Sequence, residues 1–319
     1  MIGVAGGGAF GTALAIALGQ DGRDVTLWAR DVGQVQIMRQ TRRNGARLPD
    51  GVLPARVKVT SDLLHLSGAK VILLALPMQT LHGFLQTHRQ ALTGSALIAC
   101  CKGMDVGTLQ SATTLISAAF PQAVAGILTG PSFANDIAMG LPTALTLAVT
   151  GPQGQALQHL LSTPTLRIYR TSDVIGAELG GALKNVIAIA AGVVVGAGLG
   201  DSARAALMTR GFAEMQRFAV GLGARSETLM GLSGFGDLVL TCTSAQSRNL
   251  RYGMALGSGT NFDPGVTVEG VATSRAVARM AAGLRVDMPV TRMVADLIDQ
   301  KIPLVQAVHS LMSRPLKQE

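Results

Sequence analysis

The chain has 319 residues, of which 48% are hydrophobic and 14% charged, so it is long enough for two folded domains and too apolar for extended disorder. Its formal net charge of +8 comes from scattered basic residues, and only 3% of the residues are aromatic, which argues against nucleic-acid binding. We therefore expect a small phosphorylated ligand as the anionic partner.

The apolar runs of the sequence are interrupted by Gly, Pro or a charge before the roughly 20 residues that a membrane span needs, so we expect no stable membrane insertion. No basic leader precedes the first apolar strand, so we expect no signal peptide. Cys100 and Cys101 are adjacent and Cys242 is remote, a pattern of neither a disulfide framework nor a metal pair. This cysteine pattern is typical of a reducing setting, so we expect a cytoplasmic location. No histidines pair at metal-ligand spacing, so we expect no metal.

The N-terminus begins with a short apolar strand at Ile2–Ala5, followed by a GxGxxG loop and a helical segment at 12–18. In such a loop, Gly6 allows a tight turn, Gly8 lets backbone N–H groups approach a pyrophosphate, and Gly11 allows close packing of helix and strand. The helix N-terminus adds donors for phosphate. The order of strand, loop and helix predicts dinucleotide binding.

The second strand, at 24–29, ends at Arg30, about twenty residues beyond the glycines. An Arg in this place can pair with the 2′-phosphate of NADP, whereas an acidic residue would bind the ribose hydroxyl of NAD. Asp31 follows directly and leaves NAD open as the alternative. We expect NADPH as the cofactor, with NAD as the second choice.

Further buried strands are expected along the first half of the chain, with helical segments between several of them. We expect an edge strand at 57–60 and a central strand at 71–76 that is buried on both faces. The others are expected at 96–100, 126–129, 144–149 and 166–169. The pattern predicts an α/β fold with an N-terminal Rossmann-like, doubly wound sheet.

Ligands of doubly wound sheets lie outside the carboxyl ends of the strands. The segments at 77–79, 101–103 and 130–134 are expected at that edge. Lys102 is the one charged residue among them, and it is either a functional residue or an ordinary loop lysine.

Strand patterns stop after residue 169, and helical patterns follow, with glycine turns expected near 196–200, 221–223, 231–236 and 257–265. Ser172–Val174 is expected to cap the first helix. We therefore expect a Rossmann domain at 1–172 and a C-terminal all-α, substrate-binding domain at 173–319.

The most apolar stretch of the helical half, 186–200, begins directly after Lys184 and Asn185. A helix that is apolar on all sides is expected inside a domain, where an unpaired ammonium is very costly. Lys184 is therefore either paired at a site or, as a residue at the helix entrance, extended to solvent. Gly180 and Gly181 leave room for another chain segment or a ligand.

Other polar residues of the helical half each have two interpretations. Asp237 and Thr241 share one face if their segment is helical, although Asp237 could be a helix cap. Arg248 lies in a polar stretch expected to be a loop and is either a phosphate ligand or a solvated side chain. Glu269 is either a site residue or a helix-start acid.

Several blocks of the sequence, in order along the chain, resemble those of bacterial NAD(P)-dependent glycerol-3-phosphate dehydrogenases. The matching blocks are the glycine loop at 6–14 and the segments at 101–103, 130–134, 181–188, 236–242, 247–249 and 288–290. The resemblance implies reversible reduction of dihydroxyacetone phosphate to sn-glycerol 3-phosphate, a precursor for glycerophospholipid synthesis. It also implies a homodimer.

The resemblance assigns a role to each matching residue. It makes Lys184 the general acid in reduction and the base in oxidation. The expected cofactor-binding residues are Gly6, Gly8, Ala9, Phe10, Gly11, Arg30, Lys102, Ala134, Arg248, Thr267 and Glu269. The expected substrate-binding residues are Lys102, Gly130, Ser132, Lys184, Asn185, Asp237, Thr241, Ser247, Arg248 and Asn249, of which Arg248 and Asn249 hold the phosphate.

The chain departs from the family pattern at three places. Ala9 and Phe10 replace a Ser–aromatic pair in the glycine loop, which removes a hydroxyl near the pyrophosphate. Val195 stands where the family often carries Asp, and Thr267 stands where it favours an aliphatic residue. None of these positions is the acid or a phosphate ligand.

Two other functions remain to be distinguished. A reductase of a different small phosphorylated or carboxylated ketone would share the fold. Removal of Arg248 discriminates, because it should impair reaction with phosphorylated substrates and leave cofactor binding intact. A dinucleotide-sensing regulator would show no turnover. Lys184 and Asp237 would have no role in such a protein.

Overall fold

The computed structural model describes residues 1–312 of the chain. The chain divides into two compact units, each described by itself below. Unit 1 comprises Met1–Lys102 and Gln110–Glu178, and unit 2 comprises Gly103–Leu109 and the chain from Leu179 onward. The division into folding domains after residue 172 stays a prediction, because compactness does not test independent folding.

Unit 1 contains an eight-stranded sheet in the order β10-β9-β8-β7-β6-β1-β2-β5. All neighbours are parallel except β8 and β9, which are antiparallel. The strands are β1 (Ile2–Ala5), β2 (Val25–Trp28), β5 (Val57–Thr60), β6 (Val71–Leu74), β7 (Ala96–Ala99), β8 (Ala125–Thr129), β9 (Thr143–Val149) and β10 (Leu166–Thr171).

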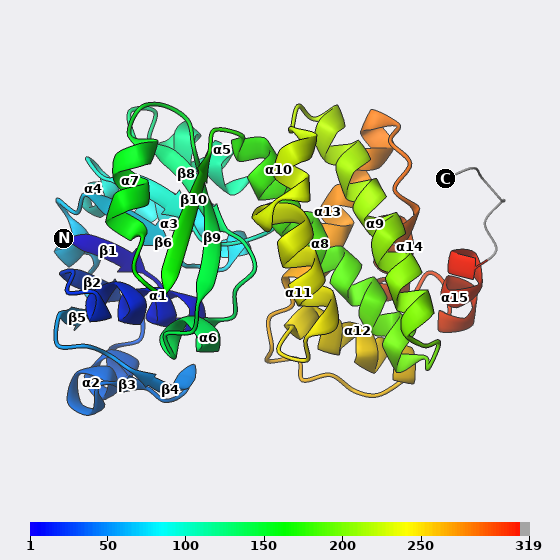
Figure 1. Ribbon diagram of the computed structural model, residues 1–319, viewed down its shortest axis with the longest axis horizontal. Coiled ribbons are helices and arrows are strands. Elements are labelled where there is room, and N and C mark those ends of the chain that lie inside the picture. The colour runs from blue at the N-terminus through cyan, green and yellow to red at the C-terminus, as the bar shows by residue number, and fades with distance from the viewer. Residues whose placement is uncertain (313–319) are drawn as a thin grey trace. The chain divides into compact units, whose positions relative to one another are not determined.

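Helices cover both faces of this sheet (Figure 1). They are α1 (Ala9–Gln20), α2 (Val32–Thr41), the 3₁₀ helix η1 (Leu63–Leu66), α3 (Met78–Thr87), α4 (Arg89–Leu92), α5 (Ala112–Ala119), α6 (Ala134–Ala138) and α7 (Gly154–Leu161). One apolar cluster joins the sheet to α1, α2, α6 and α7, and a second joins its other face to α3, α4 and α5. The predicted doubly wound architecture is confirmed.

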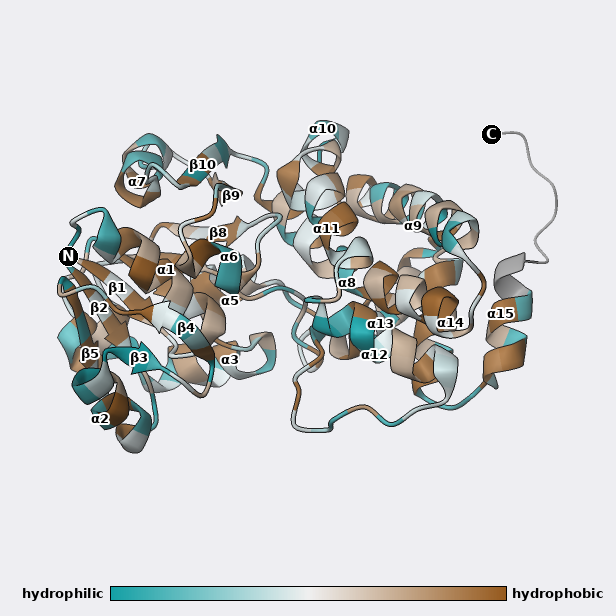
Figure 2. Cartoon of the chain, turned by 60° about the horizontal axis from the view of Figure 1, so that its bottom comes forward, coloured by the Kyte–Doolittle hydropathy of each residue, from teal (hydrophilic) through white to brown (hydrophobic). Residues whose placement is uncertain are grey.

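The strand predictions are correct in position. β5 lies at the edge of the sheet, and β6 lies between β1 and β7 with all four residues buried. Sequence patterns missed a small antiparallel pair, β3 (Arg43–Asn44) and β4 (Leu48–Val52). A two-residue strand of polar residues and a strand containing Pro and Gly carry no alternating apolar signal. In Figure 2, β3 is hydrophilic, whereas α1 is mostly hydrophobic.

Unit 2 is helical, which confirms the predicted all-α half. Its helices are α8 (Val174–Gly196), which starts in unit 1, then α9 (Asp201–Gly221), α10 (Ser226–Met230), the π-helix η2 (Leu232–Gly236), α11 (Asp237–Thr243), α12 (Arg248–Ser258), α13 (Glu269–Leu284), α14 (Pro289–Ile298) and α15 (Leu304–Met312). The glycine turn expected at 231–236 is wrong, because most of this segment forms the π-helix.

Helix α8 is the core of unit 2, and Asp173 accepts a hydrogen bond from the backbone N–H of Gly176 at its start. Among the described helices, α8 alone has the length and composition to cross a membrane, but 89% of its most apolar window is buried within the protein. Glu178 and Lys184 lie within this helix, so its apolar run is interrupted by charges, as the sequence predicts. The burial is that of a core helix.

Helices α8 and α12 approach closely through glycines. A Cβ atom at Gly192 would lie 2.1 Å from the carbonyl oxygen of Leu250, and one at Gly253 would lie 2.0 Å from that of Ile189. Gly196 and Gly257 make equally close backbone approaches one turn further along. This contact fixes the N-terminus of α12 relative to the middle of α8.

Candidate active site

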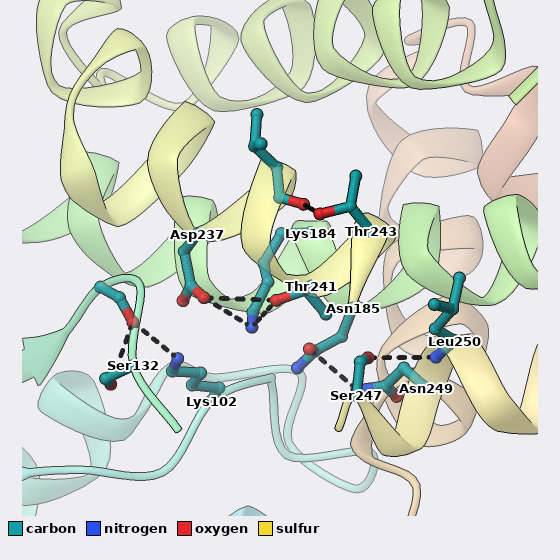
Figure 3. Close-up of polar contacts among 12 residues, drawn as sticks. Lys102, Ser132, Lys184, Asn185, Asp237, Thr241, Thr243, Ser247, Asn249 and Leu250 are labelled. Carbon is teal, nitrogen blue, oxygen red and sulfur yellow. Dashed lines mark hydrogen bonds and ion pairs between the residues drawn. The ribbon is translucent and has the colours of Figure 1, made fainter. Parts of the chain in front are cut away.

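Lys184 lies in the interior of α8 and is buried, with 6% of its surface exposed. Its Nζ donates to Asp237 Oδ1 at 2.9 Å and to Thr241 Oγ1 at 2.6 Å, and Thr241 donates to the same carboxylate oxygen at 3.3 Å (Figure 3). The interpretation of Lys184 as a helix-entrance residue extended to solvent is wrong, because α8 begins ten residues earlier. Lys184, Asp237 and Thr241, the acid–base cluster, form a buried and paired polar group.

Two close backbone approaches position Asp237. The π-helix η2 leads directly into α11, and a Cβ atom at Gly234 would lie 2.0 Å from the carbonyl oxygen of Leu229. At Gly180, one turn before Lys184 on α8, a Cβ atom would lie 2.6 Å from the carbonyl oxygen of Ser233. Small residues therefore let the η2 segment lie against α8. Asp237 is 1% exposed, and its carboxylate accepts from Lys184 instead of capping a helix.

A second polar pair connects α8 with α12 and α13. Asn249 donates through Nδ2 to Asn185 Oδ1 at 2.9 Å (Figure 3). Asn249 Oδ1 accepts from the backbone N–H of Gly270 at 3.0 Å. Asn185 is 2% exposed, and its Nδ2 has no hydrogen-bond partner among the described residues. A buried amide donor without a partner is costly, so this donor is suited to a ligand oxygen.

Arg248 lies at the N-terminus of α12, so the expectation that this stretch is a loop is wrong. Ser247 is the N-cap, since its hydroxyl accepts from the backbone N–H of Leu250 at 3.1 Å. The exposed Arg248 side chain makes no hydrogen bond or ion pair with any residue in 1–312. An unpaired guanidinium beside helix N–H groups is a suitable arrangement for phosphate.

The glycine loop of unit 1 fits a dinucleotide. A Cβ atom at Gly6, whose φ is +133°, would lie 2.2 Å from the carbonyl oxygen of Ala75, and one at Gly11 would lie 2.1 Å from that of Gly6. At Gly8, by contrast, a Cβ atom would meet no protein atom within 4 Å. The loop is therefore tight where strand and helix meet and open at Gly8. Ala9 and Phe10 begin α1 and are partly buried.

Sequence reasoning missed two residues that hold this loop. Asn44 Nδ2 donates to Thr12 Oγ1 at 2.7 Å and to the carbonyl oxygen of Gly7 at 3.0 Å. Gln34 Nε2 donates to the same carbonyl oxygen at 2.8 Å and to Asn44 Oδ1 at 3.0 Å. Asn44 is 1% exposed. No sequence motif marks these contacts, because β3 and α2 bring the two residues to the loop from over 25 positions away.

Arg30 is exposed beyond the end of β2. Asp31 caps α2, accepting from the backbone N–H of Gln34 at 2.6 Å. The Asp31 carboxylate is thus already engaged, whereas the Arg30 guanidinium makes no hydrogen bond or ion pair within the described chain. This difference favours a cofactor with a 2′-phosphate.

Lys102, Gly130 and Ser132 lie together at the carboxyl edge of the sheet in unit 1. The carbonyl oxygen of Gly130 accepts from Lys102 Nζ at 3.4 Å and from the Ser132 hydroxyl at 3.3 Å (Figure 3). Gly130 has φ of +139°, which favours glycine. Ala134 follows as the first residue of α6. This edge therefore presents an ammonium and a hydroxyl held by one carbonyl group.

The remaining predicted cofactor residues belong to unit 2. Thr267 is exposed in the segment before α13, and Glu269 is the first residue of that helix. The helix-start interpretation of Glu269 is therefore correct in position, and its role at a cofactor stays a prediction.

Thiol and metal chemistry have little support in the described chain. Burial raises the pKa of the Cys242 thiol to about 12, although the nearby Lys184 charge lowers it, so the thiol is protonated at neutral pH. Among residues 1–312, no group of three His, Cys, Asp or Glu residues could hold a metal ion. The acid–base cluster is thus the chemically distinctive group of unit 2.

Two family models match almost the whole chain. The model of the NAD-dependent glycerol-3-phosphate dehydrogenase N-terminus matches residues 1–155, and that of the C-terminus matches residues 173–309. Two curated relatives, both called glycerol-3-phosphate dehydrogenase [NAD(P)+], cover the full chain. The protein from Roseobacter denitrificans is 58% identical over 100% of this chain and 99% of its own length. The protein from Cereibacter sphaeroides is 59% identical over 100% of both.

A solved structure shares the arrangement of the elements. The crystal structure of glycerol-3-phosphate dehydrogenase from Coxiella burnetii has a TM-score of 0.93 and 35% sequence identity, with 98% of each chain covered. Sequence and fold therefore indicate the same family.

Proposed function

Because the chain belongs to the NAD-dependent glycerol-3-phosphate dehydrogenase family, we propose that it reduces dihydroxyacetone phosphate to sn-glycerol 3-phosphate with Lys184 as the general acid. It is an NAD(P)-dependent oxidoreductase by this family membership. Lys184 is proposed as the acid because its Nζ contacts both Asp237 and Thr241 inside unit 2.

Lys184 has the properties that the reaction requires of an acid. When bound, the reduced nicotinamide supplies a hydride to C2 of the ketone. A protonated Lys184 polarises the ketone oxygen, stabilises the negative charge that develops there and then donates the proton. Asp237 and Thr241 orient the ammonium, and burial strengthens its interaction with the oxygen. In the oxidation direction, neutral Lys184 accepts the proton from the hydroxyl.

Asn185, Asn249 and Arg248 are proposed to hold the substrate. The unpartnered Nδ2 of Asn185 is suited to a substrate oxygen. The Arg248 guanidinium and the N-terminus of α12 offer donors to the phosphate, and Ser247 and Asn249 flank it. Lys102, Gly130 and Ser132 are proposed as further substrate contacts from unit 1.

Unit 1 is proposed to bind NADPH in preference to NADH. The loop at Gly6, Gly8 and Gly11 would hold the pyrophosphate through backbone N–H groups, and Arg30 would pair with the 2′-phosphate. Ala9, Phe10, Lys102, Ala134, Arg248, Thr267 and Glu269 are proposed as further cofactor contacts. The capping role of Asp31 supports this preference.

The product would supply glycerophospholipid synthesis. We propose that the enzyme is a cytoplasmic homodimer, in line with the resemblance to the bacterial family. Size-exclusion chromatography with light scattering tests the dimer.

The experiment follows NADPH and NADH oxidation by the purified protein with dihydroxyacetone phosphate. Lys184→Met should lower kcat by about 100-fold to 10,000-fold, the usual contribution of a general acid. NADPH binding by Lys184→Met, measured by fluorescence, should be unchanged. If wild-type protein binds NADPH but does not oxidise it with this ketone, the proposed substrate is wrong.

Two further variants separate phosphate recognition from cofactor choice. Arg248→Gln should raise KM for dihydroxyacetone phosphate much more than KM for a ketone that lacks phosphate. Arg30→Gln should raise KM for NADPH and leave KM for NADH unchanged. Equal effects of Arg248→Gln on both ketones would favour the alternative of a reductase for an unphosphorylated ketone.

A further inference from the structure

A cavity of about 1010 Å³ opens in unit 1 beside the amino ends of β6, β7 and β8. Small-molecule sites commonly have volumes of roughly 300–1,000 Å³, so this cavity has the size of a ligand site. The glycine loop follows the carboxyl end of β1, which runs parallel to β6 and β7. The cavity therefore lies at the opposite edge of the sheet from the proposed nucleotide loop.

The walls of the cavity are mostly apolar. They are formed by the residues before β7 and β8, by the end of α5 and by α7, including Ala96, Phe120, Val124, Leu157 and Leu160. Phe120 is the one Phe, Tyr or Trp among the lining residues, and its ring is already in contact with a guanidinium. These walls suit a hydrocarbon chain better than a stacked aromatic ligand.

The charged residues of the cavity are all basic. Arg23, Lys70 and Arg89 line it, and no acidic residue does. Asp21 neutralises Arg23. Within residues 1–312, Lys70 and Arg89 form no ion pair. The backbone carbonyl of Lys70 accepts from the N–H of Ala96, which places Lys70 beside the start of β7.

Arg89 is held in place without being neutralised. Its Nη2 donates to the carbonyl oxygen of Ala119 at 2.8 Å, and its guanidinium lies 5.4 Å from the centre of the Phe120 ring. A fixed cation whose charge is not balanced is suited to a ligand anion, because little side-chain freedom is lost on binding.

Ser95 provides an independent indication of a ligand. It lines the cavity and is 2% exposed, and its Oγ has no hydrogen-bond partner in the part of the chain that the structure describes. Buried hydroxyl groups are normally hydrogen-bonded. An anionic oxygen in the cavity would accept a bond from this hydroxyl.

We propose that this cavity is a second ligand site, which binds an anion with a hydrocarbon chain. The chain lies along the apolar wall of α7 and the strand ends. The head group, a carboxylate or a phosphate monoester, lies near Lys70, Arg89 and Ser95. Both head groups share the required chemistry of negatively charged oxygens that accept hydrogen bonds.

Calorimetric titration of the full-length protein tests the proposal with three probes of equal chain length, each below its micelle concentration. The probes are dodecanoate, dodecyl phosphate and dodecanol. We expect at least one of the anions to bind about tenfold or more tightly than the uncharged alcohol, as charge-assisted hydrogen bonds require. The anion that binds better identifies the head group.

Matched variants assign the binding to this cavity. Lys70→Gln with Arg89→Gln should weaken anion binding at least tenfold, and Ser95→Ala should weaken it severalfold. Lys58→Gln with Arg47→Gln removes the same charge from exposed positions of unit 1 outside the cavity and should change the affinity less than twofold. NADPH oxidation by the Lys70–Arg89 variant should stay within twofold of wild type, since neither residue belongs to the proposed catalytic set.

Three results would overturn the second site. These are no binding of either anion to wild-type protein, binding of dodecanol as tight as that of the anions, or an unchanged anion affinity in the Lys70–Arg89 variant. Each can be obtained whether or not the protein reduces dihydroxyacetone phosphate.

Discussion

A buried ammonium is tolerated at Lys184 because a carboxylate and a hydroxyl group lie against it. Pairs of this kind stabilise weakly overall, yet breaking one of them is costly because a charge is left unpaired. The Lys184–Asp237 pair is therefore better explained by positioning of the acid than by stability. The buried Nδ2 of Asn185, the next residue of α8, has no partner among the described residues. This donor is likewise better explained by ligand binding than by stability.

Asp237→Asn should keep the shape of the acid–base cluster and remove its negative charge. We expect unfolding free energy to fall by about 3–5 kcal/mol, since Lys184 is left as an uncompensated buried charge. We also expect kcat to fall by about 100-fold or more. Urea denaturation and steady-state kinetics measure the two effects.

Asp263→Asn is the matched control for Asp237→Asn, because Asp263 is an exposed residue of unit 2. Combining Asp237→Asn with Lys184→Met removes the unpaired charge, so it should restore stability without restoring activity. A kcat within threefold of wild type for Asp237→Asn would show that the pair does not serve catalysis.

At the scale of elements, the contact between α8 and α12 depends on glycine. Gly253→Ala would place its Cβ atom 2.0 Å from the backbone of Ile189, where no side chain can move aside. We expect a loss of stability of about 1–3 kcal/mol or more, as in overpacked cores. A raised KM for dihydroxyacetone phosphate should accompany it, because α12 carries Arg248.

Gly283→Ala is the control for Gly253→Ala. Gly283 lies in α13, and a Cβ atom there would meet no neighbouring atom within 4 Å. Alanine favours helix over glycine by about 0.5–1 kcal/mol, so this variant should be unchanged or slightly more stable. Equal destabilisation of both variants would exclude close packing as the cause.

The short pair of β3 and β4 supports the glycine loop, because β3 contains Asn44. Asn44→Ala removes the side chain that joins Gly7 to Thr12, so the glycine loop should lose its fixed shape. We expect NADPH affinity to fall by about tenfold, which corresponds to the free-energy contribution of one or two buried hydrogen bonds. Fluorescence titration with NADPH measures it.

The KM of Asn44→Ala for dihydroxyacetone phosphate should stay within twofold of the wild-type value. Asn261 is an exposed residue of unit 2, so Asn261→Ala should change neither this KM nor the NADPH affinity. Unchanged NADPH affinity in Asn44→Ala would mean that Gln34 alone holds the loop.

At the scale of the whole molecule, stability should depend on the ionisation of Glu178. This buried residue of α8 accepts from the backbone N–H of Thr113 at 2.8 Å and from its hydroxyl at 2.7 Å. Burial raises its pKa above the ordinary value of 4.5, and the hydrogen bonds from Thr113 and Ser111 oppose the shift.

The sign of the pH effect follows from the raised pKa. Below pH 4.5 the carboxyl is protonated in both the folded and unfolded states, so burial carries no charge penalty. Above pH 4.5 the unfolded state ionises first, and folding stability falls until the pH passes the folded pKa. Glu178→Gln cannot ionise, so its stability relative to wild type should rise between pH 4 and pH 8. Urea midpoints across this range measure the difference, and a constant difference would contradict the shift.

The amino-acid sequence by itself determined the fold class and most of the element order. Buried parallel strands are nearly continuous apolar runs, and the glycine loop has a fixed spacing, so both are visible locally. The same local signals singled out Lys184, Asp237 and Arg248 as residues that need an explanation. They left the explanation open, because the environment of a side chain depends on residues that are distant in sequence.

The tertiary structure decided the rest. Lys184 and Asp237 are 53 residues apart, and only the packing of η2 and α11 against α8 makes them a pair. Sequence patterns likewise left open whether Lys184 is a helix-entrance residue extended to solvent, and they missed Asn44 at the glycine loop. Burial and pairing are properties of the folded chain, since a charge becomes costly or useful only when neighbouring elements exclude water from it.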